Sequence, residues 1–198
     1  MDSTYNKLIA SGIKLFGDSG FDAVSVRDIA SEAEVNISAV SYHFGGKSEL
    51  YQAVVAFLVT EVKTQLDALG SARFIKLSLT EMEQRLPEII IEFQKMFHSQ
   101  HGISRLNIFT REIASQDKNS SHQYVSAMIE NVHSFFQNIL CAYYSQRNES
   151  TDKVEFVISL LITTLKNITL RQSEPLCAKY QQPDVLERLI KLIVYGKL

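Results

Sequence analysis

The sequence predicts an all-α protein, with three short helices at its N-terminus followed by a bundle of longer ones, about nine helices in all. Apolar residues recur every three or four positions along nearly the whole chain, which is the period of an amphipathic helix. Five of the eight glycines lie in the first 46 residues, and all three prolines lie later. Turns therefore divide the beginning of the chain into short segments, and the remainder forms long ones.

The N-terminal segment predicts three helices in succession. The apolar spacing of the first runs up to Phe16, and residues 17–20 supply a stop signal. The second begins at Ser25, because Asp28 three residues later forms a pattern like a capping box, and it lasts about two turns. The third covers residues 37–44 and ends at a pair of glycines.

A long helix is predicted over residues 47–69, where no glycine or proline interrupts the pattern before Gly70. A helix of this length can connect two modules. Residues 71–80 show no clear pattern. Further helices are expected over residues 82–99, 103–117, 121–144, 152–171 and 183–195.

Composition and missing signatures exclude several classes of protein. The 198 residues are 45% hydrophobic and 21% charged, with a net charge of −2. The first 55 residues hold four basic and seven acidic residues. Bulk positive charge therefore cannot drive nucleic-acid binding. Cys141 and Cys177 lack the spacing of a disulfide framework or a zinc site. No signal peptide or membrane-length apolar stretch is present, which predicts a soluble cytoplasmic protein with no membrane partner. Common catalytic, phosphate-binding and metal-binding motifs are absent, so we expect no enzyme, catalytic residue, metal or cofactor.

The spacing of the second and third helices suits a DNA-binding helix-turn-helix, in which the later helix enters the major groove. The residues that would face the groove, which is about 12 Å wide, are small: Asn36, Ser38, Ala39 and Ser41. Tyr42, His43 and Lys47 follow, and their polar tips can reach phosphates.

A run of matched positions in register carries a more specific resemblance. The matched residues are Gly20-Phe21, Val24 to Ala30, Ala33, Val35, Val40 to Phe44 and Lys47 to Leu50. Over roughly residues 5–55 the chain resembles the DNA-binding domain of the TetR family of transcriptional regulators. This implies a DNA-binding domain over residues 1–50 and a helical ligand-binding and dimerisation domain over residues 51–198, connected by the helix 47–69. It also implies a repressor that binds a near-palindromic operator as a homodimer and is released by a small-molecule effector.

The resemblance assigns DNA-binding roles to particular residues. Ser25 matches a phosphate contact at the start of the second helix, and Arg27 matches a position that reaches a base or a phosphate. The groove-facing positions are Asn36, Ile37, Ser38, Ala39 and Ser41, and the later phosphate contacts are Tyr42, His43 and Lys47. Simpler interpretations stay open: Ser25 can act as a helix cap alone, Tyr42 can pack on the first helix, and His43 can be an ordinary surface histidine.

Two departures from the family pattern stand in this domain. Glu34 occupies the turn position where the family usually has glycine; if that position needs a positive φ, Glu adds about 1 kcal/mol of strain and a negative charge near DNA. Gly45-Gly46 replaces the polar pair that usually precedes the basic residue, here Lys47, and so removes side-chain phosphate contacts.

The C-terminal part predicts a dimer interface and a ligand cavity. The helix 152–171 is apolar on two faces, so it needs two partners, and a twofold copy joined by the helix 183–195 can supply the second one; a wholly internal helix in a monomer is the alternative. The residues expected to line a cavity for the effector are Phe93, Phe97, Leu106, Phe109, Arg111, Glu112, Tyr124 and Met128. Aromatic residues at this spacing also fit a plain core, and a helical enzyme or ligand carrier remains a second class of function.

Overall fold

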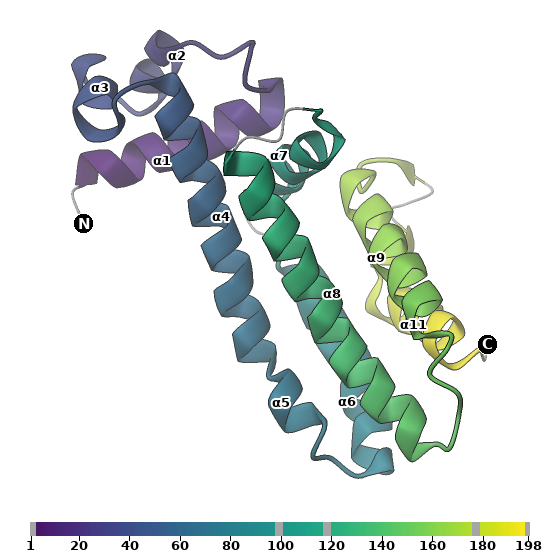
Figure 1. The fold of residues 1–198 in the computed structure, drawn as a ribbon. Coiled ribbons are helices and arrows are strands. Elements are labelled where there is room, and N and C mark those ends of the chain that lie inside the picture. Colours follow the sequence, from purple (N-terminus) through teal and green to yellow (C-terminus); the bar gives the residue numbers. More distant parts are fainter. Residues whose placement is uncertain (1–2, 98–100, 117–119, 176–178, 197–198) are drawn as a thin grey trace. The chain divides into compact units, whose positions relative to one another are not determined.

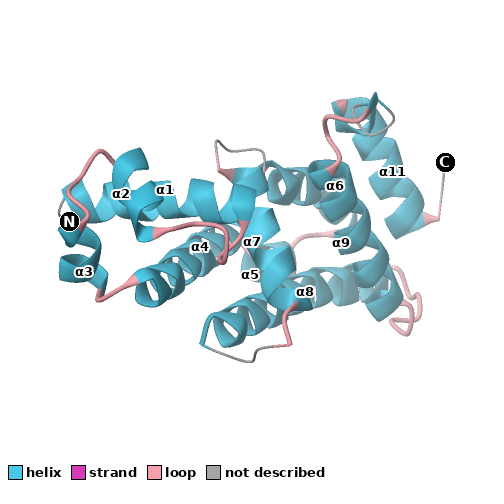
Figure 2. Ribbon diagram, turned by 90° about the horizontal axis from the view of Figure 1, so that it is seen from above, coloured by secondary structure: helices cyan, strands magenta, loops and turns pink. Residues whose placement is uncertain are grey.

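The computed structural model describes residues 3–97, 101–116, 120–175 and 179–196, and in these residues it is all-helical, as predicted. Figure 2 shows helices joined by loops, with no strand in the described part. The helices are α1 (Ser3–Ser19), α2 (Val26–Glu32), α3 (Ser38–Phe44), α4 (Lys47–Leu69), α5 (Ser71–Phe74), α6 (Leu79–Lys95), α7 (Gly102–Ala114), α8 (Ser120–Gln146), α9 (Val154–Leu170), the 3-10 helix η1 (Lys179–Gln181) and α11 (Pro183–Tyr195). None of the described helices is both long and apolar enough to cross a membrane.

The chain forms two compact units, and α4 and α8 each run from one unit into the other. Unit 1 comprises residues 1–62 and 99–128, and unit 2 comprises residues 63–98 and 129–198. Unit 1 thus holds α1, α2, α3 and α7, whereas unit 2 holds α5, α6, α9 and α11 (Figure 1). The predicted division of the chain at residue 50 remains a prediction.

In unit 1, α7 packs closely across the C-terminal end of α1. A Cβ atom built on Gly17 would lie 2.3 Å from the Cβ of Ser104 and 2.5 Å from its Cα, so only glycine allows this approach. The guanidinium of Arg111 donates hydrogen bonds to the carbonyl oxygens of Phe16 and Gly17, at 2.7 and 2.8 Å, and Asn107 donates a further one to Gly17. These donors satisfy carbonyl groups that a helix end leaves without partners.

The end of α1 lies slightly later than the sequence predicts. Gly17 was expected within the stop signal, but it is helical, and the helix continues to Ser19. Gly20 provides the stop, with φ at 85° and its N–H bonded to the Phe16 carbonyl at 2.9 Å. Gly17 is helical because it serves the close contact with α7 rather than the turn.

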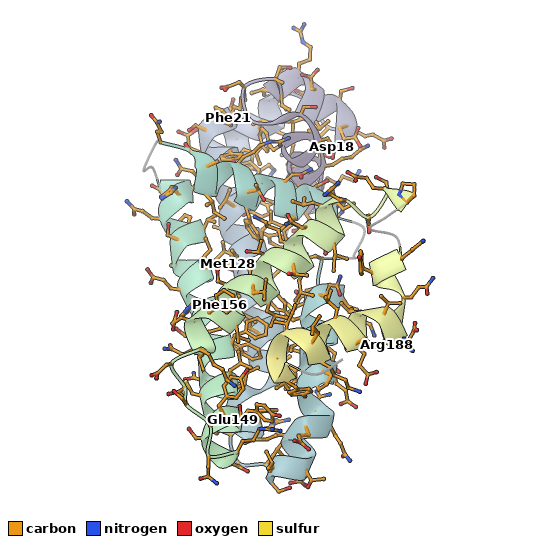
Figure 3. All side chains as sticks on the ribbon, turned by 90° about the vertical axis from the view of Figure 1, so that its right-hand side faces the viewer. Asp18, Phe21, Met128, Glu149, Phe156 and Arg188 are labelled. Carbon is orange, nitrogen blue, oxygen red and sulfur yellow. The ribbon has the colours of Figure 1, made fainter. Side chains whose placement is uncertain are left out.

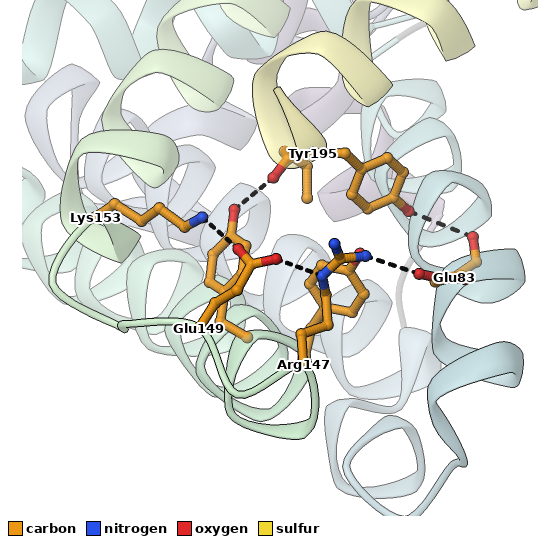
Figure 4. A network of polar contacts seen from close by, with 8 residues as sticks. Glu83, Arg147, Glu149, Lys153 and Tyr195 are labelled. Atoms are coloured by element: carbon orange, nitrogen blue, oxygen red, sulfur yellow. Dashed lines mark hydrogen bonds and ion pairs between the residues drawn. The ribbon is translucent and has the colours of Figure 1, made fainter. Parts of the chain in front are cut away.

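In unit 2, α6, α8, α9 and α11 share an apolar core. Its fully buried side chains include Leu86, Phe136, Leu161 and Ile190. A polar network closes one end of this core (Figure 4). Arg147 at the end of α8 pairs with Glu83 of α6 at 2.9 Å and with Glu149 at 2.6 Å.

Two tyrosines complete this network by bonding to main-chain carbonyl groups. Tyr144 donates to the Val194 carbonyl at 2.7 Å, and Tyr195 donates to the Glu83 carbonyl at 3.3 Å. Burial raises the pKa of Tyr144 to about 12. The network therefore ties the C-terminal helix to α6 and α8.

The predicted long helices are confirmed, with differences at their ends. Helix α6 begins at Leu79 rather than at residue 82, because Ser78 and Glu81 form a capping box that starts it earlier. The short helices α5 and η1 lie outside the predicted segments. The predicted helix ends at residues 99 and 117 fall outside the described residues.

Candidate nucleic-acid interface

The start of α2 is fixed by the capping box that the sequence predicts. The Ser25 hydroxyl accepts a hydrogen bond from the Asp28 N–H at 3.1 Å, and the Asp28 carboxylate accepts from the Ser25 N–H at 2.9 Å. The Ser25 hydroxyl also donates to this carboxylate at 2.6 Å, and these hydrogen bonds lower the pKa of Asp28. Ser25 is therefore a helix cap whose side chain is still exposed on the surface.

The turn between α2 and α3 contains a left-handed residue at the position where the family usually has glycine. Glu34 has φ at 53°, a conformation that L side chains rarely adopt. The turn closes through hydrogen bonds from Glu34 N–H to the Ser31 carbonyl at 3.1 Å and from Val35 N–H to the Ala30 carbonyl at 3.0 Å. The glutamate thus stands in a backbone conformation that favours glycine.

A side-chain contact from Asn36 supports the first residue of α3, and the helix buries only one side. The Asn36 side-chain oxygen accepts hydrogen bonds from the Ser38 N–H at 2.9 Å and from the Ser38 hydroxyl at 2.8 Å. Val40 is fully buried within unit 1. The predicted DNA-binding residues that are exposed are Ser25, Arg27, Asn36, Ile37, Ser38, Ser41 and Tyr42, while Ala39, His43 and Lys47 are half-buried.

The aromatic residues at the end of α3 divide between packing and exposure. Phe44 stacks on Tyr5 of α1, with ring centroids 4.8 Å apart, and anchors α3 to the first helix. Tyr42 is 84% exposed, so it does not pack on α1. The His43 ring lies edge-on to Tyr42 at 4.9 Å and to Tyr5 at 6.4 Å, which holds the imidazole at the surface of this corner.

Lys47, the first residue of α4, is held by a contact that the sequence did not predict. Its ammonium lies 4.2 Å from the centroid of the Phe21 ring, in the loop between α1 and α2. Such cation–π contacts are worth about 0.5–1 kcal/mol at exposed sites. Phe21 therefore positions the ammonium at the start of α4, within the same unit as α3.

The residues predicted to bind an effector are distributed over both units. Phe93 and Phe97 belong to unit 2, where Phe93 packs edge-on against Phe136 with centroids 5.0 Å apart. The other six belong to unit 1: Leu106, Phe109 and Met128 are buried, Tyr124 is 45% exposed, and Arg111 and Glu112 line a shared pocket. The cavity predicted from all eight residues together remains a prediction.

The arrangement of α1, α2 and α3 defines a helix-turn-helix domain. Comparison with known proteins gives its type: residues 8–54 match the family model of "Bacterial regulatory proteins, tetR family". The chain is 29% identical over 103 residues to the "Probable HTH-type transcriptional regulator YttP" of Bacillus subtilis, an alignment that covers 52% of this chain and 48% of that protein. The N-terminal domain of this chain is therefore a TetR-family helix-turn-helix domain, and the resemblance predicted from the sequence is confirmed.

Solved structures match along nearly the whole chain and show its fold. PfmR from Thermus thermophilus, a TetR family transcriptional regulator, matches with a TM-score of 0.71 and 18% identity over 96% of this chain and 95% of that one. The transcriptional regulator FadR from Bacillus subtilis, solved in complex with stearoyl-CoA, matches with a TM-score of 0.69 and 13% identity over 98% and 100% of the two chains. The sequence matches are shorter, since this chain spans about half the length of the first curated relative it matches.

Replacing Glu34 with glycine should stabilise the protein. Glycine adopts a positive φ without the steric cost that an L side chain carries, although it loses more backbone entropy on folding. We expect Glu34→Gly to raise the free energy of unfolding by up to about 1 kcal/mol, measured by chemical denaturation. Glu34→Gln is the matched control, because it removes the charge and keeps the strain; an equal gain in both variants would contradict the backbone explanation.

Proposed function

We propose that the protein is a transcriptional repressor that binds a near-palindromic operator as a homodimer and leaves it when a small molecule binds. The observation that carries this proposal is α3, a short helix with small polar exposed residues in a TetR-family domain. Its narrow profile suits the major groove. We propose that this activity is cytoplasmic, because DNA binding requires access to the operator.

The predicted DNA-binding residues divide by the part of DNA that they can reach. Ser38, Ala39 and Ser41 lie on α3 and are proposed to face base edges, with Asn36 and Ile37 at its start. Arg27, Tyr42, His43 and Lys47 are proposed to reach phosphates, and Ser25 to combine its capping role with a phosphate contact. Phosphate contacts set register and affinity, whereas base contacts set sequence preference.

We propose that the dimer forms through α9 and α11, within the predicted ranges 152–171 and 183–195. One face of α9 is buried in unit 2, and the opposite face is left open: Phe156 is 70% exposed and Leu160 is 41% exposed. Helix α11 packs beside α9 (Figure 3). Its Leu192 is 41% exposed. Large exposed apolar side chains on adjacent helices are typical of a protein interface.

The effector is proposed to act through α4, which is continuous from Lys47 to Leu69. Its first turn belongs to the DNA-binding domain, and its last turns belong to unit 2. A ligand that favours one position of this helix would change the distance between the two copies of α3 in the dimer and so lower the affinity for DNA. Bound DNA must then lower the affinity for the ligand by the same factor. Tenfold release needs a coupling of about 1.4 kcal/mol.

The proposal is tested by two groups of variants, measured by fluorescence anisotropy on a fragment selected from the source genome and on an unrelated fragment. Lys47→Ala and Tyr42→Phe should weaken binding to both fragments alike, because phosphate contacts carry no base information. Lys47→Ala should also lower the slope of log affinity against log salt concentration by about 1 per protomer. Changes at Ser38 or Ala39 should alter the preference between fragments instead.

Lys76→Ala is the matched control for charge, since Lys76 is exposed in unit 2. It should leave both affinities unchanged. Equal losses from Lys76→Ala and Lys47→Ala would contradict the proposed interface.

A further inference from the structure

A pocket of about 580 Å³ lies within unit 1, beside the DNA-binding helices. Four segments form its wall: the loop after α1, the first turns of α4, the end of α7 and the start of α8. Its volume is within the range of small-molecule sites, about 300–1,000 Å³. Since all four segments belong to one compact unit, the pocket is defined by that unit alone.

Two buried polar side chains in this wall each have one oxygen without a hydrogen-bond partner among the described residues. Glu112 is 6% exposed, and its Oε1 accepts a hydrogen bond from the Tyr51 hydroxyl at 2.7 Å, but its Oε2 has no partner among the described residues. Ser121 is fully buried, and its Oγ also lacks a partner in the described part of the chain. Buried polar groups are nearly always paired, so these two oxygens point to a bound group that donates hydrogen bonds.

The charges of the pocket favour a cation. Glu112 and Asp22 contribute carboxylates, and Arg111 contributes the guanidinium. That guanidinium already donates to the Phe16 and Gly17 carbonyls, which orients it toward the end of α1. The formal charge of these three side chains is therefore negative, and the unpaired Glu112 oxygen is the natural partner of an ammonium group.

The aromatic part of the wall adds an apolar surface. The rings of Phe21 and Tyr51 meet edge to face, with centroids 5.1 Å apart, and both residues line the pocket. Burial and the hydrogen bond to Glu112 raise the pKa of Tyr51, which keeps its hydroxyl a donor to that carboxylate. Aromatic faces attract cations and pack against apolar groups.

We propose that this pocket binds a small organic amine, with its ammonium group on Glu112 Oε2 and its apolar part against Phe21 and Tyr51. Ser121 supplies a second polar contact. Because Phe21 also contacts Lys47, an occupant can change the position of the phosphate-binding ammonium. This regulatory consequence rests on the proposed function, whereas amine binding does not.

The test uses benzylamine, with benzyl alcohol and benzoate as neutral and anionic probes of similar shape. Each is titrated into the full chain without DNA and followed by ligand-observed NMR. We expect benzylamine to bind at least about tenfold more tightly than the other two, and Glu112→Gln to weaken it about tenfold or more. Glu32→Gln is the control, because Glu32 is an exposed carboxylate of the same unit outside this pocket.

Ser48→Trp provides a second variant if Glu112→Gln fails to fold. Ser48 is exposed at the rim, so an indole there should fill the pocket and abolish benzylamine binding without disturbing the core. No benzylamine binding, equal affinity for the three probes, or unchanged affinity in Ser48→Trp and in a folded Glu112→Gln would overturn the proposal. A chain that binds benzylamine but no DNA would support amine binding and overturn the proposed function. A chain that binds DNA but no benzylamine would support the proposed function and overturn amine binding.

Discussion

Replacing Gly17 with alanine should destabilise the protein by about 2–3 kcal/mol, because the added methyl group cannot fit against α7. Its Cβ would lie 2.3 Å from the Ser104 Cβ and 2.7 Å from the Ser104 carbonyl oxygen. Two of the three close atoms belong to the backbone, so a side-chain rotation cannot relieve the clash. Helix α7 must move, and the hydrogen bonds from Arg111 and Asn107 to the end of α1 are lost with it.

The loss is measured as the change in the free energy of unfolding in urea. Asn6→Ala is the control, because Asn6 is exposed on the same helix and the substitution adds no buried atom. It should change stability by less than about 0.5 kcal/mol. A Gly17→Ala protein as stable as this control would show that α7 does not pack on α1 at this distance.

Placing a charge at Phe156 should dissociate the dimer and, with it, operator binding. In Phe156→Asp the carboxylate would be desolvated at the proposed interface, where the native ring supplies the largest exposed apolar surface on α9. We expect a monomer at micromolar concentration and an operator affinity at least about a hundredfold lower, because one protomer then binds one half-site. Light scattering gives the mass, and anisotropy gives the affinity.

Ile75→Asp is the matched control for this experiment. Ile75 is 47% exposed in unit 2, but it lies outside α9 and α11. It should leave the mass and the affinity unchanged. A dimer that persists in Phe156→Asp would contradict the proposed interface, and a native protein that is monomeric at this concentration would remove the dimer altogether.

Local patterns predicted most of the helices, because each depends on residues close together in sequence. The capping box of Ser25 and Asp28 was visible as two residue types at a fixed spacing. The positive φ at Glu34 was suggested only by the resemblance to the TetR family, which usually has glycine at this turn position. The start of α6 was missed, although Ser78 and Glu81 carry the same kind of signal. The preceding residues lack apolar periodicity, and this obscured the cap.

Contacts between distant segments were not predictable in the same way. The predicted ligand contact of Arg111 stays a prediction, but nothing in the sequence indicated that its guanidinium binds carbonyl groups more than ninety residues earlier in the chain. The partners are main-chain atoms, which leave no trace in residue type. The only local signal was Gly17, a glycine inside a helix, and its meaning depends on Ser104 across the contact. The contact between the side chains of Phe21 and Lys47 was missed because the two residues are far apart in the sequence.

Selection of genomic fragments by the purified full chain at low salt tests the central claim, sequence-specific DNA binding through α3, most directly. We predict that the recovered fragments share a near-palindromic sequence, with half-sites about one helical turn or 34 Å apart. Selection with a variant changed at Ser38 or Ala39 should recover a different sequence with the same half-site spacing. Fragments without a shared sequence, recovered no more often than competitor DNA, would contradict the account.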